Sequence, residues 1–154
     1  MWERPESEGD GVRRLIYSSL ASEPMQALEL EEMLTWSRMH NETDGITGLL
    51  LYFPPELTDQ PSFLQLLEGE ADVVQATYDR IARDTRHHDV RLVSLRDVEE
   101  RLFPQWSMGL DFVTRAQLAK ALPGRPDSPH ALVAIAEIIE DAARAEALLL
   151  EHCS

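Results

Sequence analysis

Two polar side chains stand inside apolar segments of the sequence, and together they have the chemistry of a proton-exchanging pair. Tyr17 follows Leu15 and Ile16, and Gln65 lies in the segment 63–69, Phe-Leu-Gln-Leu-Leu-Glu-Gly. A phenol gives up an electron readily when its proton leaves at the same time, and an amide both donates and accepts hydrogen bonds. A buried Tyr–Gln hydrogen bond can equally be only structural. The pair is therefore a candidate switching site that needs support from other residues.

Polar side chains also gather at the ends of two expected helices. Asn41 closes the segment Arg-Met-His-Asn, and Arg86 lies in the segment 83–87, Arg-Asp-Thr-Arg-His. An Asn amide can pair with the edge of a heterocycle, and an Arg can meet a carbonyl or phosphate with several donors. Taken singly, Asn41 is also typical of a helix C-cap and Arg86 of a solvated charge. A flat ring lying between the two helices would use both.

The elements that must position these residues follow from hydrophobic periodicity. The expected elements are a strand from Arg14, a helix capped by Ser22 and ending near Asn41, strands at 45–53 and 63–68, a helix at 71–84, and strands at 90–98 and 106–112. Because alternate residues of a strand share a face, the last strand is expected to place Trp106 and Met108 together on its apolar side. They are then either core residues or side chains that exchange places at Gln65.

The order strand, helix, strand, strand, helix, strand, strand predicts an α+β ferredoxin-like sheet with two helices on one face. In this topology the third strand inserts between the first and the second. The strands of Tyr17 and Gln65 are therefore expected to be neighbours. The segment 54–62 contains three prolines and is expected to form an unusually long hairpin loop.

The chain divides into three expected parts. Residues 1–12 are a charged, aperiodic leader, residues 13–113 form the domain, and residues 114–154 form a helical extension. In the extension we expect a short helix at 115–122, a proline-rich break at 123–129 and a longer helix at 130–151. This longer helix is expected to pass a signal to a separate protein or to help form a homo-oligomer, or else it simply covers the second face of the sheet.

Composition excludes several classes of function. Acidic residues outnumber basic ones 28 to 14, so a net charge of −14 argues against binding to nucleic acid or anionic membranes. The longest apolar stretches fall short of the roughly 20 residues that a membrane-spanning helix needs, and the first ten residues do not resemble a signal peptide. We therefore expect a cytoplasmic protein. Cys153 is the only cysteine, which argues against a disulfide, a Cys/His metal site and a cysteinyl flavin adduct.

The motifs together resemble those of the BLUF domains, which sense blue light using FAD. The resemblance covers about residues 14–112, most of the chain. The matching features are Tyr17, His40-Asn41, Gly45-Ile46-Thr47-Gly48, the segment 63–69 around Gln65, the segment 83–87, and Phe103 with Trp106-Ser107-Met108-Gly109. Each feature alone is weak evidence, whereas six in the right order are specific.

The resemblance implies a non-covalently bound FAD whose ring lies between the two helices, and a role as photoreceptor rather than enzyme. Tyr17 would lose an electron and a proton on illumination, and their return would leave Gln65 with changed hydrogen bonds and the absorption shifted to the red. Trp106 and Met108 would relay the signal. The cofactor-binding residues implied are Asn41, Arg86, His87, Asp84, His40, Met33 and Ile81, and no metal is implied.

Three other functions would need features that the sequence can be compared with. An acylphosphatase-like enzyme needs a basic, glycine-rich loop after the first strand, and residues 18–22 contain no Gly, Arg or Lys. A flavin-dependent oxidoreductase needs a substrate site, and the chain has no nicotinamide-binding motif. A flavin-free interaction module with the same fold would differ from the sensor in being colourless.

Overall fold

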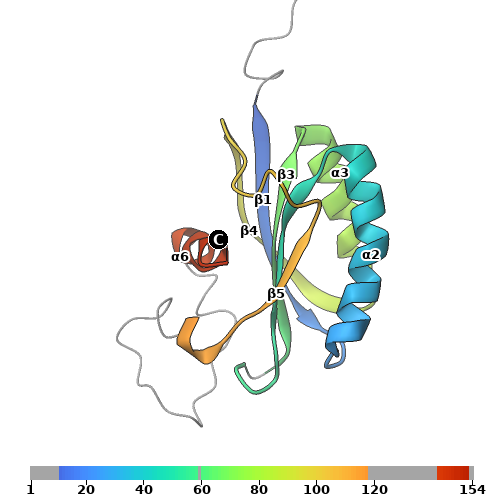
Figure 1. Ribbon diagram of the computed structural model, residues 1–154, viewed down its shortest axis with the longest axis vertical. Coiled ribbons are helices and arrows are strands. Elements are labelled where there is room, and N and C mark those ends of the chain that lie inside the picture. Colours follow the sequence, from blue (N-terminus) through green and yellow to red (C-terminus); the bar gives the residue numbers. More distant parts are fainter. Residues whose placement is uncertain (1–10, 59, 118–141, 153–154) are drawn as a thin grey trace, which may run out of the picture.

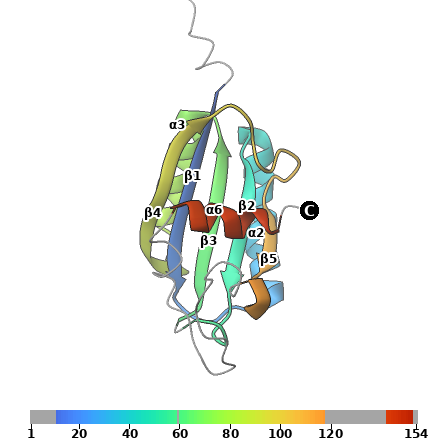
Figure 2. The ribbon, with the colours of Figure 1, turned by 90° about the vertical axis from the view of Figure 1, so that its left-hand side faces the viewer.

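The computed structural model describes residues 11–58, 60–117 and 142–152. One five-stranded sheet forms the middle layer, with α2 and α3 on one face and α6 lying across the other (Figures 1 and 2). The elements are β1 (Val12–Ala21), α2 (Ala27–Asp44), β2 (Thr47–Phe53), β3 (Ser62–Gly69), α3 (Ala71–Ala82), β4 (His87–Val98), β5 (Gly109–Phe112) and α6 (Ala142–Leu150).

The strand order is β4-β1-β3-β2-β5, with β5 parallel to β2 and the other neighbours antiparallel. The expected α+β ferredoxin-like topology is thus confirmed, since β3 lies between β1 and β2. In the β1–β3 register Tyr17 stands directly opposite Gln65. The long loop expected between β2 and β3 is also present, because β2 ends at Phe53 and β3 begins at Ser62.

The bounds of α2 differ from those expected. Its N-cap is Gln26, whose backbone N–H donates to Glu29 Oε1 at 3.1 Å. Ser22 is therefore wrong as the helix cap; its hydroxyl donates to the Thr85 carbonyl at 2.8 Å. The helix ends at Asp44 because Gly45 takes the left-handed conformation, with φ of 74°, which glycine adopts without strain.

Strands β2 and β3 are buried on both faces, as their nearly continuous apolar sequence predicts. They approach so closely at Gly48 that a Cβ atom there would lie 1.9 Å from the backbone oxygen of Leu66. This position therefore admits only glycine without displacing a strand.

Two hydrophobic layers flank the sheet. The layer on the α2–α3 side includes Leu15, Leu30, Leu34, Leu50, Leu67, Val74 and Met108. The layer on the α6 side includes Ile16, Leu49, Leu51, Leu64, Leu66, Phe103, Leu148 and Leu149. Because alternate residues of β1, β2 and β3 belong to different layers, each central strand contributes to both.

A buried ion pair on the α6 side joins the same two strands as Tyr17 and Gln65. Arg14 and Glu68 are opposite one another in the β1–β3 register, and Arg14 Nε lies 2.8 Å from Glu68 Oε2. Glu68 Oε1 also accepts from the backbone N–H of Leu102 at 2.8 Å. From α6, Glu146 approaches Arg14 Nη1 at 3.4 Å and Arg96 Nη2 at 2.8 Å.

Other expectations need correction at element boundaries. Strand β4 begins at His87 rather than at residue 90, and β5 covers only Gly109–Phe112. Residues 115–117 are helical, whereas the rest of the expected helix at 115–122, the break at 123–129 and the first part of the helix at 130–151 lie outside the described residues.

Candidate functional site

Tyr17 and Gln65 form a buried hydrogen-bonded pair on the face of the sheet that α2 and α3 cover. The side chains are 2% and 6% exposed, and the Tyr17 hydroxyl donates to Gln65 Oε1 at 2.5 Å. On its other side, the Gln65 amide donates from Nε2 to the Met108 sulfur at 3.1 Å. A thioether is a weak acceptor, so the Gln65 amide is held strongly at its oxygen and weakly at its nitrogen.

Burial raises the pKa of the Tyr17 phenol far above its ordinary value, and the negative charges that Tyr78 and Asp84 can carry raise it further. The phenol therefore stays protonated at every physiological pH. A buried phenolate is unfavourable here, so the proton does not leave Tyr17 by ordinary ionisation. Its hydrogen-bond partner, Gln65 Oε1, is the atom placed to receive the proton if the ring loses an electron.

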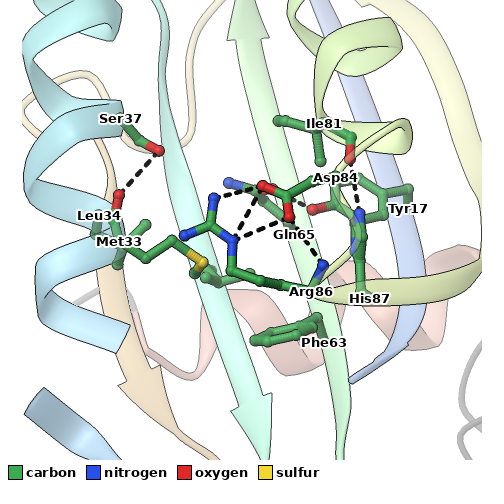
Figure 3. Close-up of a pocket in the computed structure, with 11 residues that line it drawn as sticks. Tyr17, Met33, Leu34, Ser37, Phe63, Gln65, Ile81, Asp84, Arg86 and His87 are labelled. Carbon is green, nitrogen blue, oxygen red and sulfur yellow. Dashed lines mark hydrogen bonds and ion pairs between the residues drawn. The ribbon is translucent and has the colours of Figure 1, made fainter. Parts of the chain in front are cut away.

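A hollow between α2, α3 and the sheet opens onto this pair. Its wall combines apolar side chains with the polar groups of Tyr17, Gln65 and Ser37 (Figure 3). The residues that line it are Tyr17, Met33, Leu34, Ser37, Leu50, Phe63, Gln65, Ile81, Asp84, Arg86 and His87. A larger hollow of about 470 Å³ adjoins it and shares Ser37, Gln65, Ile81, Asp84 and Arg86. Together they form a slot with apolar sides and hydrogen-bonding edges.

Asp84 and Arg86 form an ion pair at the opening of the slot. Arg86 Nε donates to Asp84 Oδ1 at 2.9 Å, and Arg86 Nη2 is paired with Asp84 Oδ2. The hydrogen bond from Arg86 holds the pKa of the Asp84 carboxyl below its ordinary value, and the carboxylate in turn raises the pKa of Arg86. In the view of Figure 3 the pair lies between Met33 and Tyr17.

His87 is fixed by hydrogen bonds at both ring nitrogens. Nε2 lies 2.7 Å from the carbonyl of Ile81, which can only accept, and Nδ1 lies 2.7 Å from the hydroxyl of Ser19. In the neutral ring Nε2 therefore carries the proton and Nδ1 accepts from Ser19. The ring meets Tyr17 edge-on, with centroids 6.1 Å apart. His87 thus joins the end of α3 to β1 and supports the Tyr17 ring.

Asn41 lines the larger hollow and also holds the segment before β5. Its Nδ2 donates to the Ser107 carbonyl at 2.7 Å. The two neighbouring carbonyls are bound as well: Gly48 N–H donates to Trp106 at 3.0 Å, and Arg38 Nε donates to Met108 at 2.7 Å. Three consecutive carbonyls are therefore anchored to α2 and β2, and this fixes the position of Met108.

The expectation that Trp106 and Met108 share one face is wrong. Met108 lies in the α2–α3 layer beside Gln65, whereas Trp106 packs in the α6 layer and stacks on Phe103 with centroids 5.4 Å apart. Both residues precede β5, which begins only at Gly109. Strand alternation does not apply to them because the chain at residues 106–108 is an irregular bend rather than a strand.

The structure brings Met33, Ile81, Asp84, Arg86 and His87 to the same hollow as Tyr17 and Gln65. His40, by contrast, lines neither hollow. Its ring lies against Trp36, with centroids 3.9 Å apart, and its Nδ1 is 3.2 Å from the Trp36 carbonyl.

Several lining residues were not among the cofactor-binding residues expected from the sequence: Trp36, Ser37, Phe63, Thr77, Arg80 and Arg83. Two of them could have been predicted. Phe63 shares the strand parity of Gln65, and Ser37 lies one helical turn from both Met33 and Asn41. Trp36 and Arg80 carry no such signal, because they are exposed helix residues that the fold alone brings to the slot, and Arg83 is an exposed residue just after α3.

Two further findings concern the described residues as a whole. Among residues 11–58, 60–117 and 142–152, no three His, Cys, Asp or Glu side chains gather in a way that could hold a metal ion. Across the same residues, none of the helices has the length and apolar character required to span a bilayer.

Residues 12–109 match the model of a protein family described as BLUF, sensors of blue-light using FAD. Among curated relatives, the photoactivated adenylate cyclase subunit beta of Euglena gracilis is 36% identical over 95 residues, which are 61% of this chain and 10% of that protein. The chain thus spans about a tenth of the length of this relative.

Solved structures show the same relationship. The photo-activated state of BlsA has a TM-score of 0.69 and 26% identity, and the match covers 91% of this chain and 93% of that one. BlrP1 of Klebsiella pneumoniae, in a structure with FMN and cyclic diGMP, has a TM-score of 0.56 and 26% identity over 66% of this chain and 26% of that one.

Proposed function

The chain belongs to the BLUF family of blue-light sensors that use a flavin, and from this premise we propose that it binds FAD non-covalently in the slot between α2 and α3 and acts as a photoreceptor, not as an enzyme. The observation that carries the proposal is the buried chain of hydrogen bonds from Tyr17 through Gln65 to Met108 at the wall of that slot. No feature of the described residues favours an oxidoreductase or a flavin-free module.

The residues of the slot fit a flat heterocycle with one polar edge. Met33 and Ile81 offer apolar surfaces for the ring faces, and Gln65 and Asn41 offer amides for its edge. Arg86 supplies guanidinium donors, with Asp84 beside it as a counter-charge. We propose the cofactor-binding roles of Asn41, Arg86, Asp84, Met33 and Ile81 on this basis. For His87 we propose support of Tyr17, and for His40 contact with Trp36.

A bound flavin supplies a strong one-electron oxidant when it absorbs blue light. With the flavin bound, Tyr17 would give up the electron, and because its ring cannot be left charged in this buried place, its proton would pass to Gln65 Oε1. When electron and proton return, the Gln65 amide is left in a changed hydrogen-bonding state. The weak bond from Nε2 to the Met108 sulfur makes this rearrangement easy, because little is lost when it breaks. Met108 is then the first residue to respond.

The test is spectroscopic. The purified full chain should be yellow, and its visible absorption should move reversibly to longer wavelength under blue light and recover in the dark. The same protein reconstituted with FAD after removal of its pigment should respond identically. A colourless protein that takes up no flavin would contradict the proposal, as would a flavin-loaded protein with an unchanged spectrum after illumination.

We also propose residues 13–113 as the photosensor unit and 114–154 as an extension that carries the output to a separate protein. Support comes from α6, which packs on the sheet face opposite the slot and is bound through Glu146 to Arg14 and Arg96. Hydrogen exchange of residues 142–150 in dark and light tests this. Equal protection in both states would count against α6 as the output element. Cytoplasmic location and homo-oligomer formation stay predictions from the sequence.

A further inference from the structure

An exposed tryptophan lies at the rim of the larger hollow. Trp36 on α2 is 55% exposed, although indole is a side chain that proteins usually bury, and it lines the larger hollow. Leu28 and Met39 on the same helix are exposed as well, but neither lines either of the two hollows that form the slot. Trp36 is therefore the one of the three whose exposed surface faces a site.

The indole is held in place from two helices. His40, one turn along α2, lies against it at 3.9 Å between ring centroids. Across the slot on α3, the guanidinium carbon of Arg80 is 6.0 Å from the indole centroid. These contacts limit the rotamers of Trp36, and an aromatic side chain that is already ordered loses little entropy when a second ring stacks on it.

The wall of this larger hollow is basic in a strongly acidic protein. Arg80, Arg83 and Arg86 line the larger hollow, in a chain whose net charge is −14. Asp84 neutralises Arg86. Within residues 11–58, 60–117 and 142–152, neither Arg80 nor Arg83 forms a salt bridge. Arg80 and Arg83 are thus cations without an ion-pair partner among these residues, and they lie beside the ordered indole of Trp36. This combination suits a ligand in which a phosphate is joined to an aromatic base.

We propose that Trp36 and Arg80 form a subsite for the nucleotide end of the cofactor and make the protein selective for FAD over shorter flavins. Trp36 stacks on the adenine, and Arg80, with Arg83 beside it, faces the diphosphate. FMN ends at a single phosphate and lacks the adenine, and riboflavin lacks both. This proposal rests on the proposed function, because it requires a flavin in the slot.

The test compares three flavins on the full chain freed of pigment. Dissociation constants for FAD, FMN and riboflavin are measured by quenching of flavin fluorescence. Wild-type protein should bind FAD most tightly. Trp36→Ala should weaken FAD binding about tenfold and change FMN and riboflavin binding less than about twofold. Trp36→Phe, which keeps a stacking ring, should retain most of the FAD affinity.

Two further variants complete the experiment. Met39→Ala removes an equally exposed apolar side chain from α2 away from the slot and should change no dissociation constant. Arg80→Gln should weaken FAD and FMN but not riboflavin, and added salt should reduce the difference. Far-UV circular dichroism and the melting temperature establish that each variant is folded.

The alternatives give different results. If Trp36→Ala weakens all three flavins equally, or none of them, or if the wild type does not prefer FAD, Trp36 does not select the nucleotide and the proposal is wrong, while the photoreceptor function stands. If the wild type binds none of the three flavins, the proposed function itself fails, and the subsite with it.

Discussion

Strands β1 and β3 are joined by polar side chains on both faces of the sheet, and the two pairs differ in kind. On the slot side, Tyr17 and Gln65 form a neutral pair whose chain of hydrogen bonds ends at a sulfur atom. On the α6 side, Arg14 and Glu68 form a charged pair, and Glu68 also accepts from two backbone N–H groups, those of Leu102 and Phe103.

This difference suggests a role for each pair: Tyr17–Gln65 as a switch, and Arg14–Glu68 as an anchor that holds β1 and β3 in register. A neutral amide with one weak partner has alternative arrangements of similar energy, whereas a buried carboxylate with several donors has only one good arrangement. Both pairs are formed by directly opposed residues. The rigid pair therefore fixes the strand register within which the neutral pair is proposed to rearrange.

The largest effect is expected from removing the phenolic proton. Tyr17→Phe keeps the ring and should abolish the light-induced spectral shift entirely, while flavin still binds. The unfolding free energy should fall by only about 1 kcal/mol, because one buried hydrogen bond is lost. Light-minus-dark absorption spectra and urea unfolding measure the two effects.

The neighbouring tyrosine provides the control. Tyr78 lies 5.6 Å from Tyr17 between ring centroids, and its hydroxyl is not bonded to Gln65. Tyr78→Phe should therefore keep the spectral shift. A shift of normal size in Tyr17→Phe would contradict the assignment of the switch.

The anchor should show the opposite pattern. Glu68→Ala leaves Arg14 buried without its main partner and should lower the unfolding free energy by about 3–5 kcal/mol, as urea unfolding would show. Asp97→Asn breaks the exposed Arg13–Asp97 pair, which joins β1 to β4, and should change the unfolding free energy by less than about 1 kcal/mol. Equal effects of the two variants would remove the distinction between anchor and surface pair.

A smaller loss of stability, confined mainly to α6, is expected from a change at Glu146. Glu146→Gln loses its charge interaction with Arg14 and Arg96 and should lower the unfolding free energy by about 1 kcal/mol. Amides of residues 142–150 should exchange faster in this variant, even in the dark. Glu32→Gln, at an exposed site on α2, serves as the control and should leave exchange in α6 unchanged.

The smallest expected effect concerns pH. Arg86 lowers the pKa of Asp84, so the ionised carboxyl stabilises the fold above its unfolded pKa of about 3.9, and this stabilisation is lost as the pH falls through the lower folded value. Arg86→Gln should move the Asp84 pKa up towards its ordinary range and flatten the pH dependence below about pH 4. Carbon-detected NMR titration of Asp84 measures the shift. An unchanged pKa would mean that Arg86 does not hold the carboxylate in solution.

The Tyr17–Gln65 pair could be predicted from the sequence more fully than the Arg14–Glu68 pair. Apolar neighbours identify Tyr17 and Gln65 as buried, and the topology makes their strands adjacent. Glu68 lies in the same apolar segment, but a Glu before a Gly at a strand end is typical of an exposed position. Its partner Arg14 is equally inconspicuous, because their pairing depends on a register that only the folded sheet defines.

The failure at Trp106 has a different cause. The alternating pattern of residues 106–112 is real, but the β2–β5 ladder begins only at Gly109. The carbonyls of residues 106–108 are bound instead by Arg38 and Asn41 of α2 and by the Gly48 N–H before that ladder. Period-2 arguments hold only where a strand exists. The same tertiary override explains Ser22, whose hydroxyl binds Thr85 rather than a helix end.

Gly48 has a consequence for how this sequence can vary. With the Leu66 oxygen 1.9 Å from the place of a Cβ atom, even alanine at this position would push apart the two strands that carry Gln65 and the start of the 106–108 anchorage. At Gly45, only three residues earlier, an added Cβ atom would have no neighbour within 4 Å. This position requires only a left-handed backbone, which asparagine also tolerates. In a library of variants selected for folding, we expect no substitution at position 48 to be tolerated, whereas a few substitutions at position 45 should be.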